Sequence, residues 1–326
     1  MFRALLLTQQ DKKTLANIES IDEQQLPEGD VTVAVEYSSL NYKDGMAITG
    51  TGKIVRQFPM VPGIDLSGTV LDSQSERFKA GDKVVLTGWG VGETHWGGLA
   101  EKARLKSDWL VPLPQGLSLQ QTMKIGTAGL TAMLCVQALL DANITPQSGP
   151  ILVTGASGGV GSVAISLLTQ LGFEVTAVTG RAEQNRTWLE QRGASQVIDR
   201  SEFTDDARPL EKQRWAGAID TVGSKVLAKL LSQMQYGATV AACGLAGGFD
   251  LPTTVMPFIL RNVRLQGVDS VYCPLERREQ AWNKLAELLP ESHYQQACHE
   301  IELEQAPQYA QTLIDGQLTG RVVVKL

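Results

Sequence analysis

ILVTGASGGVG, residues 151–161, is the stretch that decides the fold of this 326-residue chain. Its first four residues predict a short buried strand, and its glycine-rich turn leads into a helical pattern that Gly172 closes. This order is typical of a dinucleotide site, in which Gly158 lets the backbone approach a pyrophosphate and Gly161 lets the helix pack against the strand. An alanine stands where the first glycine of this fingerprint is usual. The expected cofactor contacts in the turn are Ala156, Ser157, Gly158, Gly159, Val160 and Gly161.

The same turn also contains Gly-x-Ser-x-Gly centred on Ser157, which is the nucleophile elbow of α/β-hydrolases. His293 and His299 lie downstream, with Asp250 or Asp269 between, so the hydrolase order of Ser, Asp and His is satisfied. A hydrolase elbow, however, follows several strand-helix units, whereas this turn opens the first such unit. The dinucleotide interpretation is favoured, and the hydrolase stays as an alternative.

Strand-then-helix units continue after the turn, which predicts a parallel sheet. Residues 1–122 instead contain short alternating runs that predict a β-rich domain. A last strand at 321–326 follows the parallel units, so we expect it to pair with the N-terminal domain. The prediction is an α/β protein with a doubly wound Rossmann domain at 123–270 and a discontinuous β-rich domain at 1–122 and 271–326. The expected parallel strands are 151–154, 175–178, 196–198, 218–220, 239–242 and 263–267.

Composition narrows the class of partner. A formal net charge of −6 disfavours a general nucleic-acid or anionic-membrane partner, because either requires a positive field. The N-terminal run MFRALLL predicts a first strand rather than a signal peptide, and no stretch approaches the roughly 18 uninterrupted apolar residues of a membrane span. The four cysteines form no Cys-x-x-Cys pair, so neither a disulfide framework nor a zinc knuckle is indicated. We expect a cytoplasmic protein.

The residues after the second parallel strand predict which nicotinamide cofactor binds. A site for NAD usually has an acidic residue there, whereas this chain has Thr179, Gly180 and Arg181. A hydroxyl and a guanidinium suit a 2′-phosphate, so we expect NADPH. Arg200, just after the third strand, is a candidate second cation for the same phosphate. The alternative is that both arginines are solvated surface residues.

The order of a β-rich domain, a late Rossmann insert and a returning C-terminus resembles the medium-chain dehydrogenase/reductase superfamily over essentially the whole chain. Within it, several motifs resemble the quinone-oxidoreductase-like branch that includes bacterial NADPH-dependent acrylyl-CoA reductases. The resemblance implies a GroES-like catalytic domain, an acyl-CoA substrate and a homodimer joined through the last Rossmann strand. It also implies cofactor contacts at Tyr42, Leu245, Ile259 and Ser270. The motifs are residues 38–44, 58–65, 86–92, 96–101, 125–133 and 253–261.

The resemblance also shows where this chain departs from zinc alcohol dehydrogenases. The departures lie at the positions that bind zinc in those enzymes. Asn41 stands where those enzymes have a ligand cysteine, residues 63–65 read Gly-Ile-Asp in place of Gly-His-Glu, and Gly126 stands at the third ligand. No cysteine precedes Cys135, so the lobe that binds structural zinc through four cysteines is missing too. Zinc needs Cys, His or carboxylate ligands. We therefore expect no metal site.

A reaction without a Lewis acid favours an activated carbon–carbon double bond over a ketone or aldehyde. Hydride addition to an enoyl thioester gives an enolate, which needs hydrogen-bond donors and a proton. We expect these from residues 41–44, treated as a loop: Tyr42 donates the proton or packs on nicotinamide, and Asn41 orients the thioester or the cofactor. Asp65 fixes the loop from below, and Lys43 pairs with Asp44.

Other features leave alternatives open. Trp89, His95 and Trp96 lie among glycines, as expected either of a substrate lid or of core aromatic residues on a turn. Lys53, Arg56, Arg261 and Arg264 are candidate cations for CoA phosphates, or solvated surface charges. The leading hypothesis is reduction of a short enoyl-CoA, most specifically acrylyl-CoA to propanoyl-CoA. NADPH:quinone reduction and an NADPH-binding sensor without turnover are the alternatives.

Overall fold

The computed structural model describes residues 1–296 and 298–326. The chain forms two compact units. Unit 1 contains Met1–Thr127, Ser270–Ala286 and Tyr294–Leu326, and unit 2 contains Ala128–Asp269 and Glu287–His293. The domain boundaries were expected between residues 122 and 123 and between 270 and 271. In the structure they lie between residues 127 and 128 and between 269 and 270. Unit 2 also contains Glu287–His293, so the expected place of this segment in the β-rich domain is wrong.

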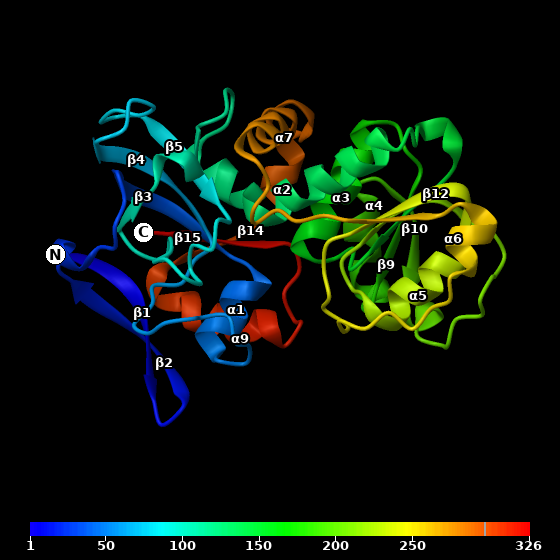
Figure 1. The fold of residues 1–326 in the computed structure, drawn as a ribbon, viewed down its shortest axis with the longest axis horizontal. Helices are drawn as coiled ribbons and strands as arrows, with labels where there is room; N and C mark the ends of the chain where they lie inside the picture. Colours follow the sequence, from blue (N-terminus) through cyan, green and yellow to red (C-terminus); the bar gives the residue numbers. More distant parts are fainter. Residues whose placement is uncertain (297) are drawn as a thin grey trace. The chain divides into compact units, whose positions relative to one another are not determined.

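Unit 2 is built on a six-stranded parallel sheet with the order β10-β9-β8-β11-β12-β13. Among these strands, Figure 1 labels β9, β10 and β12. The first strand lies inside the sheet and the order reverses beside it, as in a Rossmann domain. The α/β fold class and all six expected strand positions are confirmed. The strands are β8 (Ile151–Thr154), β9 (Val175–Thr179), β10 (Ala194–Asp199), β11 (Trp215–Asp220), β12 (Met234–Ala242) and β13 (Arg264–Gly267). The helices are α3 (Gly159–Gln170), α4 (Ala182–Glu190), α5 (Ser224–Ser232) and α6 (Met256–Arg261).

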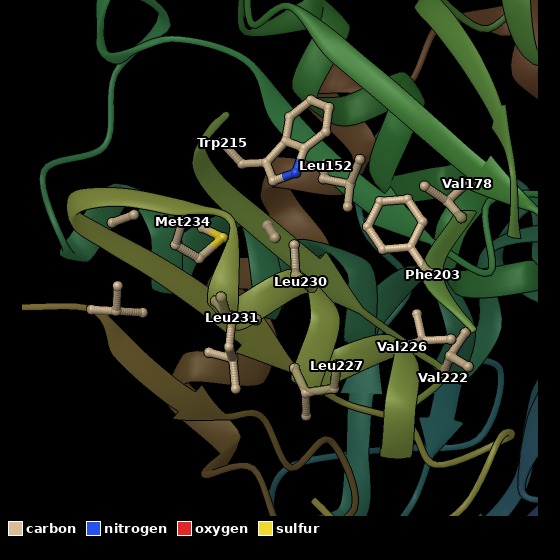
Figure 2. Packing of buried hydrophobic residues seen from close by; sticks show 14 of the residues in the cluster. Leu152, Val178, Phe203, Trp215, Val222, Val226, Leu227, Leu230, Leu231 and Met234 are labelled. Carbon is tan, nitrogen blue, oxygen red and sulfur yellow. The ribbon is translucent and has the colours of Figure 1, made fainter. Parts of the chain in front are cut away.

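An apolar core holds α5 against one face of this sheet. Phe203 and Trp215 lie among leucines and valines of β8, α5 and β12, and all of them are buried (Figure 2). The apolar side chains of α5 recur on one face of the helix, which is the pattern that packs a helix on a sheet. This packing fixes the strand ends from which the cofactor turn projects.

Unit 1 contains a seven-stranded sheet with the order β14-β15-β3-β4-β5-β7, with β6 paired to β3. The C-terminal strand β15 pairs antiparallel with β3, so the expected return of the chain to the N-terminal domain is confirmed. The N-terminal run forms the expected strand β1, within a separate hairpin with β2. The strands are β1 (Phe2–Gln10), β2 (Lys13–Ile21), β3 (Val31–Leu40), β4 (Asp65–Ser73), β5 (Lys83–Thr87), β6 (Lys102–Leu105), β7 (Leu110–Pro112), β14 (Cys298–Glu302) and β15 (Arg321–Lys325).

Two short helices of unit 1 lie side by side, α1 (Tyr42–Thr49) and α9 (Ala306–Ile314) (Figure 1). They bury Ala47 and Ile48 with Ala306 and Ala310 in one apolar cluster. Because α1 begins directly after β3, its first turn is held between the sheet and α9. The remaining helices are α7 (Leu275–Leu288) and α8 (Glu291–Gln296), and short 3₁₀ turns lie at Glu23–Gln25, Ser107–Trp109, Pro146–Ser148, Arg200–Phe203 and Leu303–Gln305.

Helix α2 (Leu119–Asp141) is interrupted at Gly126, whose φ of 55° and ψ of −163° are not helical. The chain passes from unit 1 to unit 2 just after this kink. By length and composition α2 is apolar enough to cross a membrane, but 72% of its most apolar window is buried inside the protein. Such burial is typical of the core helix of a globular protein.

Candidate active site

The glycine-rich turn has the close contacts that its sequence predicts. A Cβ at Gly161 would lie 2.5 Å from the carbonyl oxygen of Gly155 and 2.7 Å from Cα of Ala156, so helix α3 packs on the turn only without a side chain there. Gly158 precedes α3 and its N–H donates to the Gly155 carbonyl, 2.9 Å away. The first N–H groups of α3, from Gly159 onward, have no carbonyl one turn earlier in the helix. The turn therefore fits an anionic pyrophosphate.

The hydroxyl of Ser157 faces Thr179 at the end of the neighbouring strand β9, with 2.9 Å between the two oxygens. This contact overturns the hydrolase alternative, because the elbow serine has a threonine and not a histidine as its partner. His293 instead contacts Ser166 of α3 through Nδ1, at 3.2 Å. His299 belongs to unit 1.

The tips of β9 and β10 each lead into an arginine, and both arginines lie next to Gly180. Thr179 ends β9 and is buried, and Arg181 follows Gly180 at the start of α4. Arg200 follows β10, and its guanidinium carbon lies 3.2 Å from the Cβ position of Gly180. The bare glycine thus leaves room for a guanidinium. No acidic side chain ends β9, so the charges at this edge favour a phosphate over a ribose hydroxyl.

The three cofactor contacts that the resemblance adds differ in their surroundings. Leu245 and Ile259 of unit 2 are exposed apolar side chains, at 65% and 72%. Ser270, in unit 1, is buried, and its carbonyl accepts a hydrogen bond from Arg278 of α7 at 3.0 Å. The roles of all three remain predictions.

A buried polar cluster surrounds Asp65 in unit 1. Its carboxylate accepts hydrogen bonds from the Ser39 hydroxyl at 2.7 Å and the Asn41 amide at 2.8 Å. Thr127 donates both its backbone N–H, at 2.9 Å, and its hydroxyl, at 2.5 Å. Asp65 is fully buried, so these donors replace the water that its charge has lost. The geometry supports the predicted role of Asp65 in fixing the segment at Asn41.

Asn41 precedes helix α1, so the candidate catalytic residues begin a helix and are not on a loop. The side chain of Asp44, in the first turn, accepts from the backbone N–H of Asn41 at 2.8 Å, which is half of a capping box. Its other oxygen accepts from the N–H groups of Gly63 and Ile64. Burial and the charge of Asp65 raise the pKa of Asp44 to about 7, whereas these N–H bonds oppose the rise.

The expected pair of Lys43 with Asp44 is wrong. Lys43 binds Glu93 at 2.8 Å, while Asp44 is buried against the backbone. Adjacent residues in the first turn of a helix point in different directions, so one reaches the surface and the other faces the sheet. The expectation failed because it treated residues 41–44 as an irregular loop.

Arg321, at the start of β15, completes the cluster, and the sequence analysis did not identify it. Its guanidinium donates to Asn41 Oδ1 at 3.0 Å and to Ser39 Oγ at 2.9 Å, and it lies 3.7 Å from Asp65 Oδ2. Its Nε–H donates to the carbonyl of Lys124. The signal was an arginine directly before three valines at the start of the C-terminal strand, a position where a buried charge needs a partner.

The residues at this site do not fit a zinc ion. At the positions matched to zinc ligands, Asn41 offers an amide that already binds Asp65 and Arg321, and Gly126 offers no side chain. A cationic guanidinium occupies the space beside both. In the part of the chain that the structure describes, no group of three His, Cys, Asp or Glu side chains has an arrangement that holds a metal.

Other candidate residues also have defined places. Tyr42 begins α1, and 47% of the residue is exposed. Trp96 packs against two apolar clusters, and His95 stacks edge-on against Trp109, which favours the core interpretation of this turn over a lid.

Arg261 was a candidate cation for the CoA phosphates, and this expectation is wrong. Its guanidinium binds three backbone carbonyls of unit 2 instead.

Lys53, Arg56 and Arg264, the remaining candidates for CoA phosphates, are exposed. Their role stays a prediction.

Comparison with known proteins agrees with this geometry. A model of the alcohol dehydrogenase GroES-like domain matches residues 27–115, and one of the zinc-binding dehydrogenases matches residues 159–289. Three curated relatives span nearly their own full length and that of this chain. They are the probable acrylyl-CoA reductase AcuI of Escherichia coli K12 (65% identical, 99% of each chain), acrylyl-CoA reductase AcuI of Ruegeria pomeroyi (52%, 99% of each) and the putative quinone oxidoreductase YhfP of Bacillus subtilis (44%, 100% and 99%).

Among solved structures, YhdH of E. coli K-12 with bound NADPH is 66% identical and superposes with a TM-score of 0.97 over 99% of each chain. The family that the motifs predicted is thereby confirmed. The chain belongs to the medium-chain dehydrogenase/reductase superfamily.

Proposed function

We propose that this protein catalyses the NADPH-dependent reduction of the carbon–carbon double bond of a short enoyl-CoA, and specifically of acrylyl-CoA to propanoyl-CoA. The observation that carries the proposal is the 65% and 52% identity, over nearly the whole chain, to proteins named as acrylyl-CoA reductases. The Asp65 cluster supports it as well. A site whose donor set suits a guanidinium instead of zinc favours an acceptor that needs no Lewis acid.

The residues of unit 2 fit NADPH. The turn at 156–161 would hold the pyrophosphate, and Thr179, Arg181 and Arg200 would hold the 2′-phosphate. When bound, NADPH supplies a hydride to the β-carbon of the enoyl group. The preference for NADPH over NADH then follows from charge. The two arginines favour a phosphate, and the tip of β9 lacks the carboxylate that would bind the unphosphorylated ribose of NADH.

The residues of unit 1 supply the proton and the support for it. Reduction leaves the α-carbon of the thioester in need of a proton, and we assign its delivery to the hydroxyl of Tyr42, a partly exposed residue. Asn41 holds the first turn of α1 through its bonds to Asp65 and Arg321. Since both ends of its amide are used inside the cluster, we propose that it positions Tyr42 and does not itself contact the thioester.

A homodimer in the cytoplasm completes the proposal. Strand β13 ends the Rossmann sheet and its residues are largely exposed, so its free edge is suited to pairing with a second copy. The negative net charge disfavours both a nucleic-acid partner and an anionic-membrane partner. Quinone reduction is the second candidate, favoured by the 44% identity to a putative quinone oxidoreductase.

The choice of acceptor is tested by following NADPH absorbance with acrylyl-CoA, with a benzoquinone and with neither. We expect turnover of the thioester with a higher kcat/KM than that of the quinone, and slower turnover with NADH. Reduction of the quinone and not of acrylyl-CoA would overturn the substrate. Absence of reduction with any acceptor would favour an NADPH-binding sensor.

Arg181→Ala tests the cofactor preference. Loss of a charge-assisted bond to the 2′-phosphate, worth about 1.5 to 3 kcal/mol, should raise the KM for NADPH by about 10- to 100-fold and leave the KM for NADH unchanged. Arg208→Ala, at an exposed arginine of the same unit, is the matched control and should change neither value. Equal changes for both cofactors in Arg181→Ala would remove Arg181 from the phosphate site.

Tyr42→Phe tests the proton donor. Removing a general acid should lower kcat by roughly 100-fold or more, while the Kd for NADPH, measured by fluorescence, stays within about twofold. Tyr37→Phe, on the adjoining strand β3, serves as the control and should retain activity. A Tyr42→Phe enzyme with the kcat of the native protein would show that the proton comes from another group or from water.

A further inference from the structure

The buried charges of unit 1 are gathered where β3, β4, β15 and the kink of α2 meet. Asp44 and Asp65 are each at most 1% exposed, and their carboxylates interact closely enough for the charge of one to raise the pKa of the other. Lone buried carboxylates are costly unless a cation or several donors compensate them. Arg321, with an exposed fraction of 3%, supplies a cation 3.7 Å from the carboxylate of Asp65.

Backbone pairing sets the place of Arg321. Val322 of β15 pairs with Leu40 of β3, the residue before Asn41, so Arg321 begins β15 beside Asn41. Its planar fork then divides between two partners, with one nitrogen on Asn41 Oδ1 and the other on Ser39 Oγ. A fork held at both nitrogens has a fixed orientation, unlike a single ammonium.

The bare backbone at Gly126 makes room for this guanidinium. A Cβ at Gly126 would overlap Nη2 of Arg321 and would approach the oxygen atoms of Asp65 and Ser39. The left-handed φ of 55° also favours glycine at this position. Asn41 and Gly126, which the resemblance matches to metal ligands of zinc alcohol dehydrogenases, therefore flank a guanidinium in this chain.

We propose that Arg321 is a positioning residue for the reaction, whose guanidinium is the fixed cation that orients Asn41 and, through it, the first turn of α1 that carries Tyr42. The inference rests on the proposed function and deepens it. Because it is buried, Arg321 needs no contact with substrate or cofactor for this role. It holds a side chain in place, as a bound metal does for its ligands, but it polarises no substrate group.

Each partner of Asn41 in the cluster binds a different atom of this residue. In the side-chain amide of Asn41, Nδ2 donates to the carboxylate of Asp65 and Oδ1 accepts from Arg321. The plane of this amide is therefore fixed from both ends. Asp44 then receives the backbone N–H of Asn41 and closes the first turn. Without Arg321 the amide keeps its donor bonds but loses the bond that sets its rotation, and the carboxylates lose their cation.

Arg321→Ala in the full-length protein tests the proposal by kinetics and by hydrogen exchange. We expect kcat to fall by about 100-fold, the scale of a misplaced reacting group, with the Kd for NADPH within about twofold of the native value. Amide exchange should rise by about tenfold in peptides covering residues 41–49 and stay unchanged in residues 159–170. Arg192→Ala, at a buried arginine of unit 2 that stacks on Trp188, is the control for loss of a buried cation and should leave kcat and exchange at 41–49 unchanged.

A native kcat, or unchanged exchange at 41–49 in folded Arg321→Ala, would overturn the proposal. Equal losses in kcat and NADPH affinity would also overturn it, because they indicate general destabilisation. If Arg321→Ala does not fold, kcat, the Kd for NADPH and amide exchange are measured on Arg321→Lys instead. We expect kcat of this variant to be lowered by about tenfold. The exchange measurement needs no substrate, so it remains decisive even if acrylyl-CoA proves not to be the acceptor.

Discussion

The buried carboxylate of Asp65 is the constraint on which unit 1 depends. Its donors come from β3, from the segment before α1 and from the kink of α2, and Arg321 lies opposite from the end of the chain. Removing one partner from a buried ion pair costs about 3 to 5 kcal/mol, because the other charge stays buried. The polar cluster therefore binds distant segments together, and the C-terminal strand belongs to the site as much as to the sheet.

Unit 2 meets a different constraint, namely the close approach of helix α3 to the strand before it. Gly161 allows that approach, and the hydroxyl pair of Ser157 and Thr179 joins the turn to the next strand. Behind them, Thr154 donates to the buried Asp220 at 2.7 Å, and Asp220 accepts the N–H of Gly223. Strand ends held in this way present rigid N–H groups to a phosphate, which is what nucleotide binding requires.

Local pattern was sufficient to predict the parallel sheet of unit 2. Its six strands and the glycine turn followed from periodicity, and chain order predicted the pairing of β15 with β3 in unit 1. The site in unit 1 was harder, because it depends on contacts between distant residues. Arg321 lies 280 residues from Asn41, and no spacing or motif connects them.

The error at Lys43 and Asp44 has a related cause. Whether residues 41–44 form a loop or a helix is decided by tertiary contacts, among them Asp44 with the backbone of residues 63 and 64. Glu93, the partner of Lys43, also lies far along the chain. Sequence pattern predicted the segment as a candidate site but not the direction of each side chain.

Isotope transfer in a single turnover tests whether the enzyme moves a hydride from NADPH to the β-carbon of acrylyl-CoA. NADPH carrying deuterium at the transferred position of C4 would be mixed with acrylyl-CoA and the enzyme in ordinary water, and the thioester product analysed by mass spectrometry and NMR. The account predicts propanoyl-CoA with one deuterium, located on the β-carbon, and a hydrogen from solvent or the protein on the α-carbon. Product without deuterium, or with deuterium on the α-carbon, would contradict it.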